Sequence, residues 1–127
     1  MQFTKSKKVF IVDDDQMIRH MMEDKLKSFN HKVTTFSNGE DCLHYLSELP
    51  DVVVLDYHLD RNIKEAANGL QILETIKKNY PKIHVIMLSS QEKYSLALQT
   101  IQKGAEQYVI KDNDAFDKIV GIIAGLK

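Results

Sequence analysis

The sequence VFIVDD occupies positions 9–14, so four apolar residues end at two adjacent carboxylates, Asp13 and Asp14. A short apolar run without alternation is typical of a strand that is buried on both faces of a parallel sheet. Asp15 follows in a position suited to an N-cap, and apolar residues then recur at helical spacing. The segment therefore predicts a strand followed directly by a helix, with carboxylates between them.

Three later apolar runs end in the same way, at a polar or charged residue. Asp56 follows residues 52–55, Ser89 follows residues 85–88, and Lys111 follows residues 108–110. In an open parallel α/β sheet, the positions just past the carboxyl ends of the strands share one crevice. We therefore expect three carboxylates, a hydroxyl and an ammonium group to face one another there.

Strand and helix patterns alternate along the rest of the chain. The expected strands cover residues 9–12, 32–36, 52–55, 83–88 and 107–110. The expected helices begin after Asp15, run from Cys42 to Leu49 before Pro50, run over residues 70–80, run over residues 94–103, and begin after Asp114. This alternation predicts an α/β fold with a single doubly wound, five-stranded parallel sheet and helices on both faces. The second strand is the least apolar and should lie near an edge.

Composition limits the class of protein. The chain has 127 residues, which fits one domain over residues 1–127, and its formal net charge is −1. No global field attracts nucleic acid or an anionic membrane, so direct nucleic-acid or membrane binding is not expected. Cys42 is the only cysteine, which excludes an internal disulfide and a thiolate metal site. No apolar stretch is long enough to span a membrane and the start lacks a signal-peptide pattern, so a cytoplasmic location is expected.

The acidic residues suggest a metal site. Asp13, Asp14 and Asp56 would repel one another unless a cation neutralised them, and an oxygen-rich set suits Mg²⁺. Lys111 and Ser89 would add the groups that hold a phosphoryl group. Taken singly, each residue also has a structural interpretation: the carboxylates as helix caps, Ser89 as an N-cap and Lys111 as a solvated surface lysine. By the same reasoning Met17, Met21 and Met22 are expected to pack in the core, and the scattered histidines do not predict a zinc site.

An ordered set of short motifs carries a resemblance to a known family. The motifs are Val12-Asp13-Asp14, Leu55-Asp56, Asn68-Gly69-Leu70, Leu88-Ser89-Ser90, Gly104-Ala105-Glu106-Gln107-Tyr108 and Ile110-Lys111. In this order and spacing they resemble the receiver domain of bacterial two-component response regulators, of the chemotaxis-regulator type. The resemblance covers almost the whole chain and implies a flavodoxin-like sheet of order 2-1-3-4-5.

The resemblance also implies a chemistry for these residues. Asp56 would accept a phosphoryl group from a phosphohistidine and become an acyl phosphate. Mg²⁺ would be held by Asp13, Asp14, Asp56 and the backbone carbonyl of His58. Lys111 and Ser89 would contact phosphoryl oxygens, and Tyr108 matches the family's switch aromatic.

The resemblance also implies partners for the protein, and departures from the family pattern bear on the lifetime of the acyl phosphate. The implied partners are a sensor histidine kinase or histidine phosphotransfer protein, and a downstream protein target or output domain, with a phosphorylation-dependent dimer as a further possibility. Such a protein would not be an enzyme beyond its own phosphorylation and dephosphorylation. The sequence departs from the family in a long segment between Asp60 and Asn68, in Asp112 where a proline is usual, and in the bulky His58. His58 and the inserted segment are expected to prolong the life of the acyl phosphate.

Two other classes of protein remain open at this point. A haloacid-dehalogenase-like phosphatase would use Asp13 and Asp15, two residues apart after the first strand. Alternatively, a pseudo-receiver would keep the acidic pocket as a phosphorylation-independent interaction module. A nucleotide-binding Rossmann domain is excluded because no glycine-rich loop follows the first strand.

Overall fold

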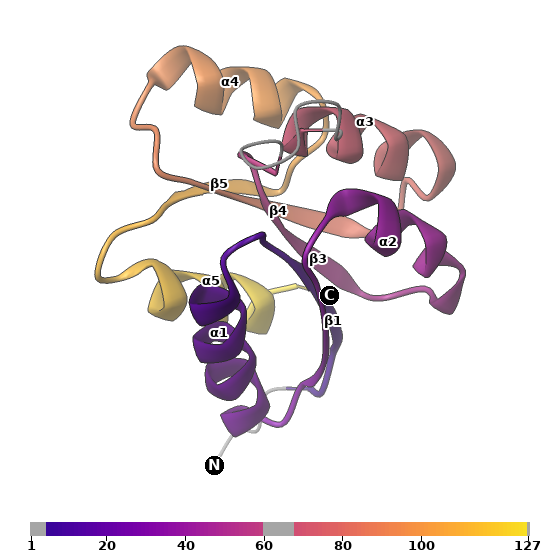
Figure 1. Cartoon of the computed structure of the whole chain (residues 1–127), viewed down its shortest axis with the longest axis vertical. Coiled ribbons are helices and arrows are strands. Elements are labelled where there is room, and N and C mark those ends of the chain that lie inside the picture. The colour runs from indigo at the N-terminus through magenta and orange to yellow at the C-terminus, as the bar shows by residue number, and fades with distance from the viewer. Residues whose placement is uncertain (1–4, 60–67, 127) are drawn as a thin grey trace.

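The computed structural model describes residues 5–59 and 68–126, in which five parallel strands form one sheet of order β2-β1-β3-β4-β5 (Figure 1). The strands are β1 (Lys8–Val12), β2 (Lys32–Phe36), β3 (Val52–Asp56), β4 (His84–Ser89) and β5 (Gln107–Ile110). The helices are α1 (Gln16–Ser28), α2 (Gly39–His44), α3 (Gly69–Asn79), α4 (Tyr94–Gln102) and α5 (Ala115–Ala124), with a 3₁₀ turn at Leu46–Glu48. The expected fold class and strand order are confirmed, and β2 lies at an edge.

Helices cover both faces of the sheet. Figure 1 shows α1 and α5 together on one side, with α2, α3 and α4 on the other. Along β1, Phe10 and Val12 belong to the core beneath α2 and α3, whereas Val9 and Ile11 belong to the core beneath α1 and α5. Both faces of the strand are therefore buried, which explains why its sequence shows no polar alternation.

The register of the sheet brings the predicted site residues to one edge. Val12 pairs with Leu55 across β1 and β3, so the residues that follow them, Asp13 and Asp56, are neighbours. On the other side of β3, Asp56 is level with Leu88, one residue before Ser89. Carboxylates separated by more than forty positions in the sequence thus meet because three strands end together.

Local signals begin and end most helices as expected. The Asp15 side chain accepts hydrogen bonds from the backbone N–H groups of Met17 and Ile18, which makes it the N-cap of α1. Gly104 follows α4 with a φ of 107°, a left-handed conformation that favours glycine. The prediction for Asp114 is wrong in part: it stands at the N-cap of α5 but its side chain makes no capping bond there. Instead, Asp112 accepts the Asp114 backbone N–H at 2.9 Å.

Two predictions about apolar residues are wrong. Leu49 is not helical: it has a φ of 56° and is 62% exposed, because the second helix ends earlier and gives way to the 3₁₀ turn. Met22 packs in the core, but Met17 and Met21 are 69% and 52% exposed since they lie on the solvent side of α1. Cys42 is buried on α2, and this burial raises the pKa of its thiol to about 12.

The remaining expectations concern the inserted segment and the membrane. The turn expected near residues 61–67 lies outside the described residues. Within residues 5–59 and 68–126, no helix combines the length and the apolar character needed to cross a membrane.

Candidate functional site

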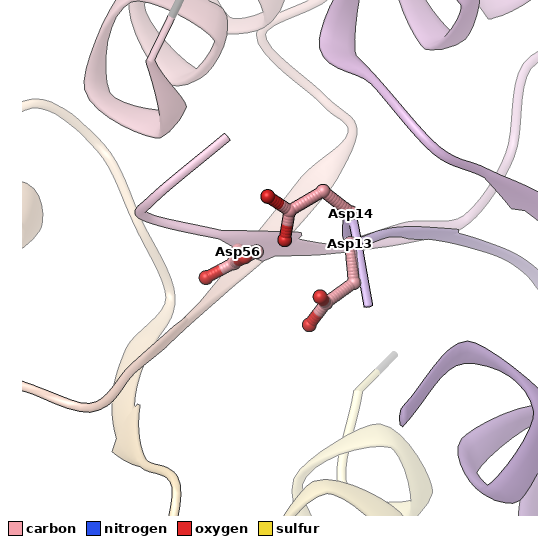
Figure 2. Close-up of side chains that lie close together, drawn as sticks. All are labelled: Asp13, Asp14 and Asp56. Atoms are coloured by element: carbon pink, nitrogen blue, oxygen red, sulfur yellow. The ribbon is translucent and has the colours of Figure 1, made fainter. Parts of the chain in front are cut away.

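Three carboxylates gather where β1 and β3 end (Figure 2). One oxygen from each of Asp13, Asp14 and Asp56 lies within 4.8 Å of the others. Asp13 is fully buried, Asp56 is 1% exposed, and Asp14 is partly buried. The structure therefore brings together the three residues that the sequence assigned to a metal site.

The surroundings of Asp13 disfavour the ionised form of its carboxyl group. Burial, and then the neighbouring charge of Asp56, raise the pKa of Asp13 from 3.8 to about 6. Its Oδ1 accepts the backbone N–H of Asp15 at 2.9 Å, and its buried Oδ2 lies 3.3 Å from the Lys111 ammonium. A buried carboxylate oxygen beside a second carboxylate is suited to bind a cation.

Lys111 bridges two of these carboxylates. Its Nζ lies 3.3 Å from Asp13 Oδ2 and 3.2 Å from Asp56 Oδ1, and its side chain is only 16% exposed. The interpretation of Lys111 as a solvated surface lysine is therefore wrong. One ammonium charge facing two buried carboxylates leaves the cluster acidic, so a metal ion and a positive side chain can both be accommodated.

Ser89 and Tyr108 are linked through one residue, Gln91. Ser89 is buried and its Oγ accepts the backbone N–H of Gln91 at 3.0 Å. Tyr108 donates its hydroxyl to the backbone carbonyl of Gln91 at 2.6 Å, and burial raises the pKa of this phenol. Ser89 does not cap α4, which begins only at Tyr94, and the Tyr108 hydroxyl is not simply solvated.

His58 lies against Asp56. Its backbone N–H donates to Asp56 Oδ1 at 3.2 Å, and its ring meets the ring of Tyr57 edge-on with centroids 4.9 Å apart. His58 and Gln91 line the same groove of about 320 Å³, between β3 and α4. The structure thus places His58, which the sequence suggested for control of the lifetime of an acyl phosphate, in the same groove as Gln91.

Two further residues shape this site and were not given a role from the sequence. Arg19 donates from its guanidinium to the backbone carbonyl of Asp13 at 2.7 Å, which ties α1 to the acidic loop. Gly69 begins α3 so close to β3 that a Cβ there would lie 2.4 Å from the Asp56 carbonyl oxygen. Gly69 was visible as part of a motif, whereas no pattern in the sequence assigns a role to Arg19.

This arrangement can bind a divalent cation and an oxyanion side by side. The carboxylates offer oxygen ligands, while Lys111 and the Ser89 hydroxyl offer donors to an anionic group. Asp15 is committed to the cap of α1, so it is not available as the second acid of a dehalogenase-like phosphatase.

Comparisons with known proteins agree with this description. Residues 9–123 match the family model described as the response regulator receiver domain. The DNA-binding transcriptional regulator NtrC of Escherichia coli K12 is 33% identical over 116 residues, which cover 91% of this chain and 24% of that protein. A putative NtrX-like response regulator of Rickettsia conorii is 41% identical over 106 residues, covering 81% of this chain and 21% of the relative. The chain thus spans about a quarter of the length of these relatives.

Solved structures are similar over nearly all of the chain. The BeF₃-activated DrrB receiver domain superposes with a TM-score of 0.79 and 31% identity, covering 92% of this chain and 93% of that one. The receiver domain of NtrX from Brucella abortus gives a TM-score of 0.79 at 25% identity, covering 94% and 99%.

Proposed function

The chain belongs to the response regulator receiver domain family, and from this membership and the site geometry we propose that it accepts a phosphoryl group on Asp56. A carboxylate oxygen of Asp56 attacks the phosphorus of a phosphohistidine. The phosphorus–nitrogen bond breaks, the histidine leaves with the electron pair and takes up a proton, and Asp56 becomes an acyl phosphate. The observation that carries the proposal is the convergence of Asp56 with two carboxylates and Lys111 at one end of the sheet.

The acidic cluster fits a magnesium ion. Asp13, Asp14 and Asp56 would hold it through carboxylate oxygens, together with the backbone carbonyl of His58. Bound there, Mg²⁺ would neutralise charge on the phosphoryl oxygens. The buried Oδ2 of Asp13 supports this assignment, because it shares the single Lys111 ammonium with Asp56 and a cation would reduce the remaining cost of keeping it charged.

Lys111 and Ser89 would position the phosphoryl group. The Lys111 ammonium already lies 3.2 Å from Asp56, so it can pair with a phosphoryl oxygen after a small displacement. The Ser89 hydroxyl would donate to another oxygen, and to do so it must turn from the Gln91 backbone that it now contacts. Both residues would act by electrostatic stabilisation and orientation, which provide most of the catalysis in phosphoryl transfer.

The biological setting follows from the relatives as a proposal. The donor would be a histidine kinase or a histidine phosphotransfer protein, and the recipient of the signal a protein target or an output domain. Phosphorylation would promote association, including a dimer, and the chain would catalyse no reaction on other substrates. We place this activity in the cytoplasm, where such donors are found.

Labelling with acetyl phosphate tests the proposal directly. The wild-type chain should take up one acid-labile phosphate when Mg²⁺ is present, and none when it is chelated. Asp56→Asn should abolish uptake, whereas Asp24→Asn, which alters an exposed carboxylate on α1, should not. Full labelling of Asp56→Asn would refute the assignment. Catalytic release of phosphate in excess of the protein would favour a phosphatase, and no uptake by the folded wild type would favour a pseudo-receiver.

A further inference from the structure

A second polar cavity lies at the opposite end of the sheet, where β2, β1 and β3 begin. Its volume is about 590 Å³, and the residues that line it include Lys7, Lys8, Asn30, His31, Lys32 and Asp51. β1 has five residues, so the length of a strand, on the order of 16 Å, separates this cavity from the acidic cluster. It is therefore distinct from the proposed phosphorylation site.

His31 presents a buried hydrogen-bond donor at this cavity. The residue is only 4% exposed, and its Nδ1 accepts the backbone N–H of Lys7 at 3.0 Å. A ring nitrogen that accepts carries no proton, so the neutral ring must carry its proton on Nε2. This Nε2 is buried and has no hydrogen-bond partner among residues 5–59 and 68–126.

Lys7 presents a second donor in the same place. It is only 7% exposed, and its ammonium makes no hydrogen bond or ion pair with the described residues. Its charge acts on His31, since it contributes with burial to lowering the pKa of that ring. With its stem largely buried and its ammonium not engaged by the described residues, Lys7 can offer this charge to a ligand in the cavity that it lines.

The other charged groups around the cavity leave it positive. The ammonium of Lys8 is paired with Glu48, and the carboxylate of Asp51 accepts the backbone N–H of Lys8 at 2.8 Å. Lys32 is exposed and makes no ion pair within the described part of the chain. Among residues 5–59 and 68–126, Lys7 and Lys32 form no ion pair, so two lysines and one donor imidazole line a cavity whose single carboxylate is already engaged.

We propose that this cavity binds an oxyanion, the phosphate or carboxylate group of a small molecule. An oxyanion has acceptors only, so it can satisfy the Lys7 ammonium and the His31 Nε2–H together, and Lys32 can close over it from the solvent side. The volume is typical of small-molecule sites and exceeds that of a single inorganic anion, which leaves room for the rest of the ligand. The site does not depend on phosphorylation of Asp56.

A residue-resolved titration tests the site. The full chain in magnesium-free buffer is titrated with inorganic phosphate or with acetate, at constant ionic strength, while the His31 ring nitrogens and the backbone amides of Lys7 and Lys32 are followed by NMR. We expect saturable chemical-shift changes at these positions. The Asp56→Asn protein should show the same changes as the wild type. Saturation by phosphate alone identifies a phosphate site, and saturation by acetate as well identifies a general carboxylate and phosphate site.

Two lysine variants provide the matched control. Lys7→Met keeps the length of the side chain and removes its charge, so it should weaken binding about tenfold or more. Lys78→Met removes an exposed lysine of a different surface depression and should bind as the wild type does. The proposal is overturned if the shifts grow linearly without saturation, or if folded Lys7→Met and wild-type protein bind equally.

Discussion

The hydroxyl of Tyr108, at the centre of β5, donates a 2.6 Å hydrogen bond to the backbone carbonyl of Gln91 in the loop that follows β4. The same Gln91 donates its N–H to Ser89, so the aromatic ring and the Ser89 hydroxyl are joined through one peptide segment. Movement of Ser89 towards a phosphoryl group would therefore disturb the contact that holds Tyr108.

Removing this hydroxyl should loosen the loop. Tyr108→Phe deletes a partly buried hydrogen bond, so we expect the free energy of unfolding to fall by about 1 kcal/mol. Chemical denaturation measures this value, and amide exchange at residues 90–93 should become faster. Tyr94→Phe is the control because Tyr94 is 80% exposed, and its stability should change by less than about 0.5 kcal/mol. Equal effects of the two substitutions would show that the Tyr108 bond contributes nothing.

Adding a methyl group at Gly69 should distort the acidic site. A Cβ at this position would lie 2.4 Å from the Asp56 carbonyl oxygen and 2.6 Å from Tyr57 Cα, so the backbone of β3 or α3 must shift. We expect Gly69→Ala to lose more than about 2 kcal/mol of stability and to slow labelling by acetyl phosphate. Gly121→Ala is the matched control, because in the described part of the chain no atom beyond its own stretch of α5 backbone lies within 4 Å of the added Cβ. The free energy of unfolding of Gly121→Ala should rise by about 0.5–1 kcal/mol. A Gly69→Ala protein as stable as the wild type would contradict the close contact.

The stabilising effect of magnesium should grow with pH. The pKa of Asp13 is raised from 3.8 in the unfolded chain to about 6 in the fold, so the folded state holds this proton more tightly. This proton stabilises the fold fully below about pH 3.8, and the stabilisation is lost as the pH rises through about 6. The free energy of unfolding then falls by an amount on the order of 2–3 kcal/mol. Mg²⁺ binds the ionised carboxylate and offsets this cost. The increase in Tm on adding Mg²⁺ should therefore be larger at about pH 7.5 than at about pH 5.

Asp13→Asn provides the test of that explanation. The variant should be more stable than the wild type at about pH 7.5 without metal, and its response to Mg²⁺ should be small at both pH values. Asp24→Asn should respond as the wild type does. A magnesium response in Asp13→Asn that equals the wild-type response would remove Asp13 from the metal site.

His58 should prolong the life of the acyl phosphate. Its backbone N–H contacts Asp56, and its ring lies in the groove through which water would approach in line with the oxygen–phosphorus bond. A broad imidazole hinders that water, whereas a smaller amide can orient it. We expect His58→Asn to lose its phosphate about tenfold faster, which corresponds to ~1.4 kcal/mol of barrier.

The decay of labelled phosphate from the two proteins measures this effect. His44→Asn, a substitution on α2, should decay at the wild-type rate. Unchanged or slower decay in His58→Asn would mean that the ring is not a shield and that it acts instead as a base or has no part in hydrolysis.

The main features of the fold were predictable because the three central strands β1, β3 and β4 contain continuous apolar runs and the strands are separated by helix or turn signals. Val9 to Val12 could be assigned as a doubly buried strand, and the ends of the strands then placed Asp13 and Asp56 at one edge. Helix limits were less predictable: Leu49 continues the apolar spacing of the second helix, yet the chain turns before it. The spacing of Met17 and Met21 likewise could not reveal which side of α1 faces the sheet, because Ile18 and Met22 have the same i, i+4 spacing one position further on.

The sequence predicted which residues belong to the site better than it predicted the contacts between them. Spacing identified Lys111 as a member but could not show that it touches both Asp13 and Asp56, since this depends on how the loop after β5 returns to the sheet. The role of Arg19 depends on the rotation of α1 about its axis, and the link from Tyr108 to Gln91 depends on the course of the loop after β4. Tertiary geometry, which no local pattern encodes, decides each of these.

The burial of Cys42 makes the protein convenient for labelling experiments. With its pKa raised to about 12, the one native thiol forms almost no thiolate near neutral pH and is shielded from reagents. A cysteine introduced at an exposed position, such as that of Tyr94 on α4, would then be the single reactive thiol. A fluorophore or spin label attached there would report motion of α4 during phosphorylation without prior removal of the native cysteine.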